Sequence, residues 1–145
     1  MKGSGELNKK VVLASHGDLA NGMLSALEMI IGHTDDIYSF GLSQYASPEV
    51  ISQEVEKIES DLLIIVCDLK GGSVYNRLIE LSVKEKVLVI SGMHLGMVLE
   101  LVLTNFDENY RLQVESIVEA SKNGVELFNL QKALSEFEKE ADRLW

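Results

Sequence analysis

Short apolar runs without alternation recur along this chain, and they constrain its fold more than any other feature. Three such runs are Val11–Ala14, Leu62–Cys67 and Val87–Ile90, and a weaker one is Ile37–Phe40. Glycine or polar residues bound these runs. Runs of this length with no polar face are typical of strands that are covered on both sides, as in a parallel sheet.

Helical periodicity fills the intervals between the runs. Ser47-Pro48 supplies an N-cap residue followed by proline at the first helical position. The helical stripes are Met23/Leu27/Ile30/Ile31 (ending near Gly32), Ile51/Val55/Ile58, Val74/Leu78/Leu81 and Met97/Leu101/Thr104. The alternation predicts an α/β fold: an open, doubly wound, mainly parallel sheet of four strands, with helices on both faces. The sequence leaves open whether a fifth strand forms at one edge of the sheet.

One domain with two appendages is the expected organisation, since 145 residues suit a single core. We expect a flexible leader over residues 1–10, a domain over 11–129 and a helical tail over 130–145. Near the end, apolar residues recur at alternating spacings of three and four: Leu127, Leu130, Leu134, Phe137, Ala141 and Leu144. Such a stripe fits a helix laid on its own domain or a partner-binding helix.

Charge and cysteine content narrow the classes of function. The formal net charge is −10, whereas nucleic acids and anionic membranes require clustered Lys and Arg. The single cysteine, Cys67, ends an apolar run, which indicates buried packing in a reducing compartment. No stretch approaches the roughly 20 apolar residues that cross a bilayer. We therefore expect a cytoplasmic protein that does not bind nucleic acid.

Two segments with chemically suitable side chains follow predicted strands. Ser15-His16-Gly17-Asp18 follows the first strand, and "DLKGGSVYN" begins at Asp68, after Leu62–Cys67. Ligands in open α/β sheets bind beyond the carboxyl ends of strands, where the strand order reverses. If these strands are neighbours there, Asp68 can fix the tautomer of His16 and leave its other nitrogen as a nucleophile.

The glycine turn after Asp68 suits an oxyanion. Gly71 and Gly72 let backbone N–H groups turn toward a concavity, and Ser73 stands where an N-cap belongs, so a helix N-terminus follows. Purely structural interpretations of the turn and of His16 stay open at this point. Gly-Gly-Ser also makes an ordinary strand-to-helix turn, and an isolated histidine is more often structural than reactive.

Other kinds of site fit less well. A Ser73–His16–Asp68 hydrolase would lack the second glycine of a nucleophile elbow. A phospho-acceptor receiver would need an acidic pair after its first strand. His16, Asp18 and Asp68 are too few ligands to predict a metal site. His33 suits a solvated turn, and His94, at another strand end, either lines the same cleft or flanks it.

The ordered combination of motifs resembles the IIA domain of the mannose-type sugar phosphotransferase system, from Val11 to about Leu127. The carriers of the resemblance are "VVLASHG", "MLSALEMIIG" and "DLKGGSVYN", with weaker agreement in "GMHLGMVLE" and "EASKNGVE". Departures are Val74 in place of proline and Leu69-Lys70 in place of a threonine and aromatic pair. Lys70 either steadies phosphate charge or faces water.

The resemblance implies a phosphotransferase that works through a phosphohistidine. His16 would take a phosphoryl group from phospho-HPr and pass it to a separate IIB protein, which serves the membrane sugar-transport components. Asp68 would orient His16, and Gly71, Gly72 and Ser73 would cradle the phosphate. No metal or organic cofactor is expected.

The resemblance also implies a homodimer, in which an edge strand near Val125–Phe128 is exchanged between subunits. That strand conflicts with a helical stripe starting at Leu127.

The alternative function is a regulatory module of the same fold, in which phosphorylation signals to a bound partner and the tail docks it. The sugar is not revealed by the sequence.

Overall fold

The computed structural model describes residues 5–144 and contains one sheet of four strands. The strands are β1 (Lys9–Ser15), β2 (Ile37–Gly41), β3 (Leu62–Cys67) and β4 (Val87–Ser91). All neighbours pair in parallel, in the order β2-β1-β3-β4. The strand order therefore reverses between β1 and β3. The predicted parallel α/β sheet and its four strand positions are confirmed.

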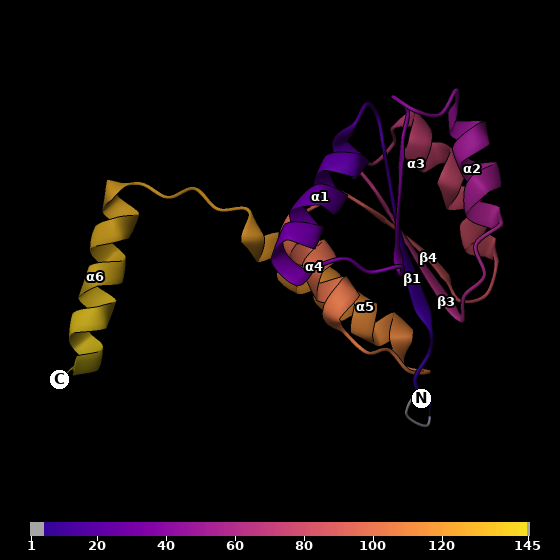
Figure 1. Cartoon of the computed structure of the whole chain (residues 1–145). Helices are drawn as coiled ribbons and strands as arrows, with labels where there is room; N and C mark the ends of the chain where they lie inside the picture. Colours follow the sequence, from indigo (N-terminus) through magenta and orange to yellow (C-terminus); the bar gives the residue numbers. More distant parts are fainter. Residues whose placement is uncertain (1–4, 145) are drawn as a thin grey trace.

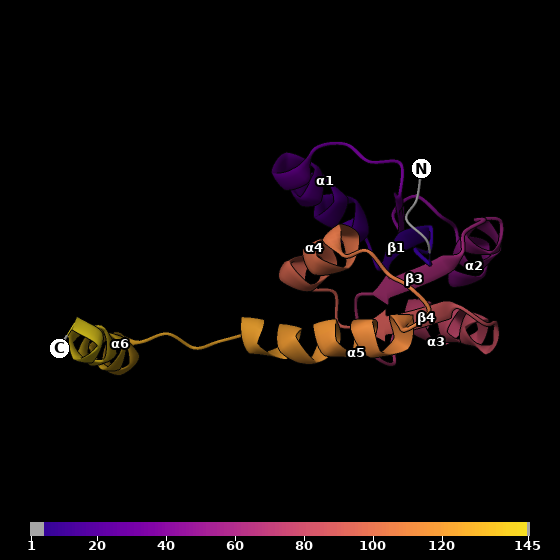
Figure 2. The same cartoon turned by 90° about the horizontal axis from the view of Figure 1, so that it is seen from below.

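Helices cover both faces of the sheet, as predicted (Figures 1 and 2). One face carries α1 (Leu19–Ile31), α4 (Leu95–Leu103) and α5 (Tyr110–Ser121). The other carries α2 (Pro48–Glu56) and α3 (Ser73–Leu78), which continues into the short 3-10 helix η1 (Ile79–Val83). No helix within residues 5–144 combines the length and the apolar character needed to span a membrane.

The core is split in two by the central strands. Successive side chains of β1 point to opposite faces, so Val11 and Leu13 pack toward α1, α4 and α5, whereas Val12 and Ala14 pack toward α2 and α3. All six residues of β3 are buried. Full burial of one such aliphatic side chain contributes about 1.5–3 kcal/mol, and the runs Val11–Ala14 and Leu62–Cys67 form the two central strands, whereas Val87–Ile90 forms the edge strand β4.

Helix ends differ from the predicted stripes at three places. The Ser47 hydroxyl accepts from the Val50 N–H (3.3 Å) with Pro48 at the first helical position, which confirms the predicted start of α2. Ile58 and Thr104 lie beyond the last helical residue, however, and Leu81 lies in the 3-10 helix. Helix boundaries fray by one or two residues, and an apolar side chain just past the end can still pack on the core.

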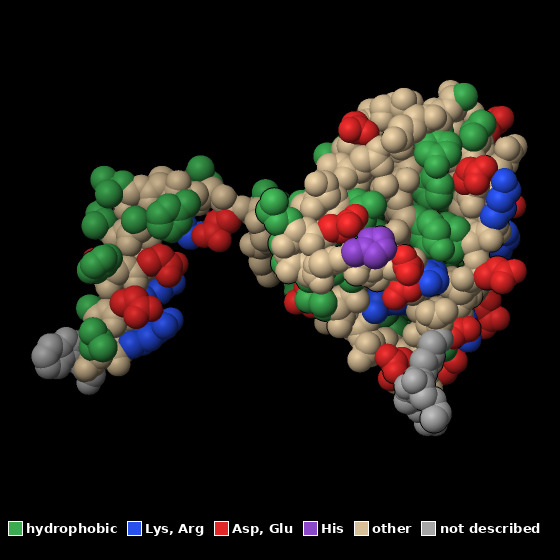
Figure 3. All heavy atoms as spheres, viewed as in Figure 1, with side chains coloured by type: hydrophobic (Ala, Val, Ile, Leu, Met, Phe, Trp, Pro, Cys, Tyr) green, Lys and Arg blue, Asp and Glu red, His purple; other side chains and the backbone are tan. Residues whose placement is uncertain are grey.

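The tail leaves the domain after the 3-10 helix η2 (Lys122–Gly124). Residues 125–129 form neither helix nor strand, and α6 (Leu130–Leu144) stands apart from the sheet with none of its residues buried (Figure 1). A helical stripe starting at Leu127 was wrong, because Asn129 caps the helix: its Oδ1 accepts from the Lys132 N–H at 2.9 Å. Hydrophobic side chains line this detached part of the chain (Figure 3).

The predicted leader and the predicted tail each extend beyond the residues that the structure describes. Within the predicted leader, residues 1–4 lie outside the described residues, whereas Lys9 and Lys10 already belong to β1. Trp145 of the predicted tail also lies outside the described residues.

Candidate functional site

His16 stands in the turn between β1 and α1, at the carboxyl end of the sheet. Ser15 just before it is fully buried, and its hydroxyl accepts from the Ala20 N–H at 2.7 Å, so the serine caps the start of α1. Asp18 occupies the N-cap position without a capping bond. Gly17 turns the chain with φ +50°. The His16 side chain is left 46% exposed, beside a buried anchor.

Asp68 faces His16 because β3 is the neighbour of β1. One carboxylate oxygen, Oδ2, accepts from the backbone N–H of His16 and lies 2.9 Å from Nδ1 of its ring. The Asp68 side chain is only 10% exposed. A carboxylate can only accept, so the imidazole proton sits on Nδ1 and a lone pair remains on Nε2. The structure thus brings together the two residues that the sequence placed at separate strand ends.

The glycine turn completes the arrangement around the ring. Ser73 Oγ lies 3.2 Å from Nε2 of His16, so the hydroxyl can donate to that lone pair. A Cβ on Gly72 would lie 3.0 Å from Cε1 of His16, so glycine at this position lets the ring come close. Gly71 has φ +79°, and its carbonyl accepts from the Asn76 side-chain amide at 3.0 Å. The sequence had given Asn76 no role.

One detail of the predicted turn was wrong. Gly72 is the N-cap of α3, and Ser73 is its first helical residue. The Ser73 side chain is consequently free to face His16 instead of capping its own helix. The backbone N–H groups of the first helical turn have no acceptor within the helix and suit an oxyanion.

The remaining histidines occupy other environments. His94, which precedes α4, accepts the Met97 N–H on its Nδ1 at 3.1 Å and packs against Gly124. His33 is exposed; its hydrogen bonds to Asp35 and then to Glu28 raise its pKa above the ordinary value. Neither of these two histidines pairs with Asp68.

Three neighbours of the site can be assigned from their surroundings. Burial, and secondarily the Asp68 charge, raise the pKa of the Cys67 thiol to about 12, so this cysteine stays protonated and unreactive at neutral pH. Lys70 is exposed and lines the groove beside β4. The Asp18 carboxylate accepts from Asn21 and Ser43.

Residues 5–144 contain no cluster of three or more His, Cys, Asp or Glu suited to a metal ion.

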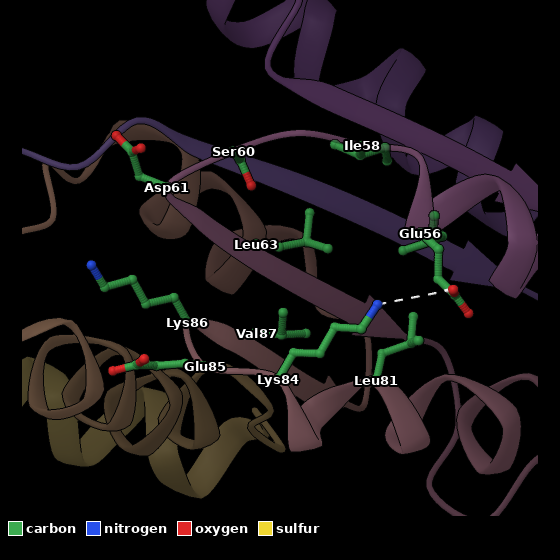
Figure 4. A pocket seen from close by; sticks show the side chains of 11 residues that line it. Glu56, Ile58, Ser60, Asp61, Leu63, Leu81, Lys84, Glu85, Lys86 and Val87 are labelled. Carbon is green, nitrogen blue, oxygen red and sulfur yellow. Dashed lines mark ion pairs between the residues drawn. The ribbon is translucent and has the colours of Figure 1, made fainter.

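Two concavities of the molecule lie away from His16. An open groove of about 950 Å³ runs between β4 and α5. A cavity of about 100 Å³ lies at the amino ends of β3 and β4, where Lys84 forms an ion pair with Glu56 (3.9 Å; Figure 4). Neither is lined by His16, Asp68 or Ser73. The half-exposed His16 ring therefore lies outside both concavities.

Residues 10–120 match a family model, that of the PTS system fructose IIA component. The chain belongs to this family. The family resemblance suggested by the motifs is therefore confirmed: the chain is a IIA component of a sugar phosphotransferase system. A search of curated proteins gave no significant match.

Solved structures agree with the IIA fold. The chain is similar to a protein from Klebsiella pneumoniae described as a phosphoenolpyruvate-dependent sugar phosphotransferase system permease (TM-score 0.80, 22% identity, covering 90% of this chain and 98% of that one). It is similar to the phosphotransferase system component EIIA from Streptococcus agalactiae (0.71, 28%, 83% and 97%). A third similar structure is the mannose/sorbose-specific IIA subunit from Enterococcus faecalis (0.69, 21%, 85% and 96%).

Proposed function

We propose that this IIA protein is a cytoplasmic phosphocarrier in which His16 accepts a phosphoryl group from phospho-HPr and passes it to a separate IIB protein. The observation that carries the proposal is the environment of the His16 ring. Nδ1 is held by a buried carboxylate, while Nε2 faces a hydroxyl at an open glycine turn. A ring held in this way has one reactive nitrogen in a fixed orientation.

The transfer step needs no proton to leave His16. Because Nδ1 carries the proton, the Nε2 lone pair attacks the phosphorus of the donor's phosphohistidine. The N–P bond of the donor breaks as the N–P bond to Nε2 forms, and the donor imidazole leaves with its electron pair. The His16 ring becomes cationic, and the Asp68 carboxylate stabilises that charge. Transfer to IIB is the same exchange in the opposite sense.

The phosphoryl oxygens meet donors that are already in place. The Ser73 hydroxyl, 3.2 Å from Nε2, can turn to donate to one of them, and the N–H groups at the start of α3 point out of the helix. Phosphoryl transfer depends mainly on positioning and on electrostatic stabilisation of this kind. Gly71 and Gly72 act here through their backbone, as the phosphate-cradling part of the site.

The proposal is tested by identifying the atom that receives the phosphoryl group. The protein, labelled with ¹⁵N-histidine, is incubated with enzyme I, HPr and phosphoenolpyruvate, and ¹⁵N–³¹P coupling identifies the phosphorylated nitrogen. We expect one acid-labile phosphate per chain, on Nε2 of His16. Phosphate on Nδ1, or on another residue, would contradict the proposal, because Asp68 occupies the Nδ1 side.

A hydrolase is a second candidate because Ser73, His16 and Asp68 form a continuous chain of hydrogen-bonding contacts, at 3.2 and 2.9 Å. In a hydrolase Ser73 would be the nucleophile. The Ser73→Ala variant separates the two candidates. A phosphocarrier still takes phosphate on His16, whereas a hydrolase loses all activity toward an ester such as p-nitrophenyl acetate.

We further propose that the protein is a homodimer in which residues 125–129 of one copy enter the groove beside β4 of the other. β4 is an edge strand, and residues 125–129, which form neither helix nor strand, expose Val125, Leu127 and Phe128. An exposed strand edge is a template for pairing with another chain. Light scattering should give a dimer for the full chain and a monomer once residues 125–145 are deleted. A deletion variant that remains dimeric would contradict this arrangement.

A further inference from the structure

The turn that carries His16 contacts the sheet on two sides, and only one of them involves Asp68. On the other side lies the loop after β2. The Leu42 N–H donates to the Ser15 carbonyl (3.0 Å), and the Ser43 N–H donates to the Gly17 carbonyl (3.2 Å). These bonds continue the β1–β2 pairing, whose last register pair is Ser15 and Gly41, beyond the ends of the strands.

Gly41 shows how closely the two loops approach. A Cβ built on this residue would lie 2.4 Å from the Gly17 carbonyl oxygen, a backbone atom that cannot rotate away. The loop after β2 therefore fixes the peptide group of Gly17, and Gly17 is the residue immediately after His16. A glycine is required here by contact, since Gly41 has no positive φ.

Asn21, on the first turns of α1, joins the side chains of this region. Its amide nitrogen donates to Asp18 Oδ1 (2.6 Å) and to Gln44 Oε1 (3.1 Å), and its amide oxygen accepts from the Ser39 hydroxyl (2.7 Å). The Ser43 hydroxyl donates to the same Asp18 oxygen at 3.1 Å. One half-buried amide thus links α1, β2, the loop after β2 and the turn that carries His16.

We propose that Asn21 is a positioning residue for His16, acting through Asp18 and the loop at Ser43. The inference rests on the proposed phosphocarrier function. Asp68 fixes the ring from the β3 side but holds only the backbone N–H and Nδ1 of His16 itself. The β2 side holds the peptide that follows, so the two supports together determine where Nε2 stands relative to Ser73. The side chain of Asn21 forms its hydrogen bonds with Asp18, Gln44 and Ser39 and not with the His16 ring.

Single-turnover phosphorylation by phospho-HPr tests the inference with Asn21→Ala. We expect the maximal rate to fall roughly tenfold, because small misplacements of a reacting group cost one to two orders of magnitude in rate. The KM for phospho-HPr should not change, since the Asn21 side chain forms its hydrogen bonds within the domain. The end-point stoichiometry and the melting temperature should stay close to those of the wild type, because alanine suits a helix better than asparagine. Amide hydrogen exchange at Ser43 should become faster.

Two further variants grade the effect. Ser43→Ala removes one bond to Asp18 and should slow transfer less than Asn21→Ala. Asn21→Asp retains the size but removes both amide donors and faces Asp18 with a second carboxylate, so its effect should be at least as large. Asn109→Ala is the matched control: this asparagine is exposed, precedes α5 and makes no side-chain capping bond, so the rate should stay unchanged.

The outcomes separate the inference from the function on which it rests. If the wild-type protein takes no phosphate on His16, the proposed function fails and the inference fails with it. If the wild type is labelled and Asn21→Ala is equally fast, only the inference is wrong. A slower rate explained wholly by a smaller labelled fraction or a lower melting temperature would also overturn it, because Asn21 would then be merely structural.

Discussion

His16 and His94 follow two strands of the same sheet at its carboxyl end, yet their rings have opposite hydrogen-bonding arrangements. Nδ1 of His16 faces the Asp68 carboxylate, so it holds the proton and leaves the Nε2 lone pair facing the Ser73 hydroxyl. Nδ1 of His94 accepts the Met97 N–H, so a neutral ring must carry its proton on Nε2. Under the proposed function, a position at a strand end is not enough to make a histidine nucleophilic, and the group that faces Nδ1 decides which ring nitrogen can react.

The glycines around the two rings sharpen the contrast. Gly72 approaches His16 from the glycine turn, whereas Gly96 and Gly124 lie against His94, each with its missing Cβ within 3.0 Å of the ring carbon Cε1. The first arrangement leaves Nε2 facing a hydroxyl on an open surface. The second packs the ring between α4 and η2. The following variants test whether this difference in environment leads to the proposed difference in function.

Replacing each histidine gives the largest expected effect. His16→Ala should abolish phosphorylation by phospho-HPr, because it removes the only histidine among residues 5–144 whose Nδ1 faces a carboxylate while its Nε2 does not. His94→Asn should retain full labelling, since asparagine can still cap α4. The measurement is incorporation of ³²P from phosphoenolpyruvate. Labelling of His16→Ala at the wild-type rate would break the comparison.

Removing the carboxylate should have the next largest effect. Asp68→Ala should slow transfer roughly 10- to 100-fold while the domain stays folded, because losing the partner that orients a histidine typically costs that much. Stopped-flow or quenched-flow labelling gives the rate, and far-UV circular dichroism checks the fold. Asp35→Ala is the matched control, because it removes the carboxylate that hydrogen-bonds His33. Unchanged rates in Asp68→Ala would exclude Asp68 from the mechanism.

A methyl group at the glycine turn should have a smaller effect. Gly72→Ala places a Cβ 3.0 Å from Cε1 of His16 and 3.2 Å from the Leu69 carbonyl oxygen, so the ring must shift. We expect transfer to slow roughly tenfold. Gly22→Ala on α1 is the control, since nothing lies within 4 Å of its Cβ. It should leave the transfer rate unchanged and stabilise the protein by about 1 kcal/mol in urea unfolding. Equal rates in both variants would show that the ring tolerates displacement.

The smallest effect concerns the stability that His94 contributes. His94→Ala removes the acceptor for the Met97 N–H and should lower the free energy of unfolding by about 1 kcal/mol, while phosphorylation of His16 continues. Urea denaturation of His94→Ala and His94→Asn measures the difference. Asparagine should recover most of the loss. If His94→Ala instead lost phosphorylation without losing stability, His94 would belong to the reactive site.

The sequence by itself determined the local structure and the chemical inventory of the site. Apolar runs and helical periods are local patterns, so they predicted the four strands, the helix faces and the glycine turn that begins α3. The same local reading extended the tail helix back to Leu127, where Asn129 caps it instead. It also made Ser73 a cap, although Gly72 takes that position.

Only the tertiary structure decided which of these pieces meet. Strand order arises from pairing between residues far apart in the chain and leaves no local period, so the sequence could place His16 and Asp68 at strand ends but could not make them neighbours. For the same reason the role of His94 and the network of Asn21 were invisible before the fold was known. Their hydrogen-bond partners are set by packing between elements, whereas the capacity to form those bonds is set by the residues themselves.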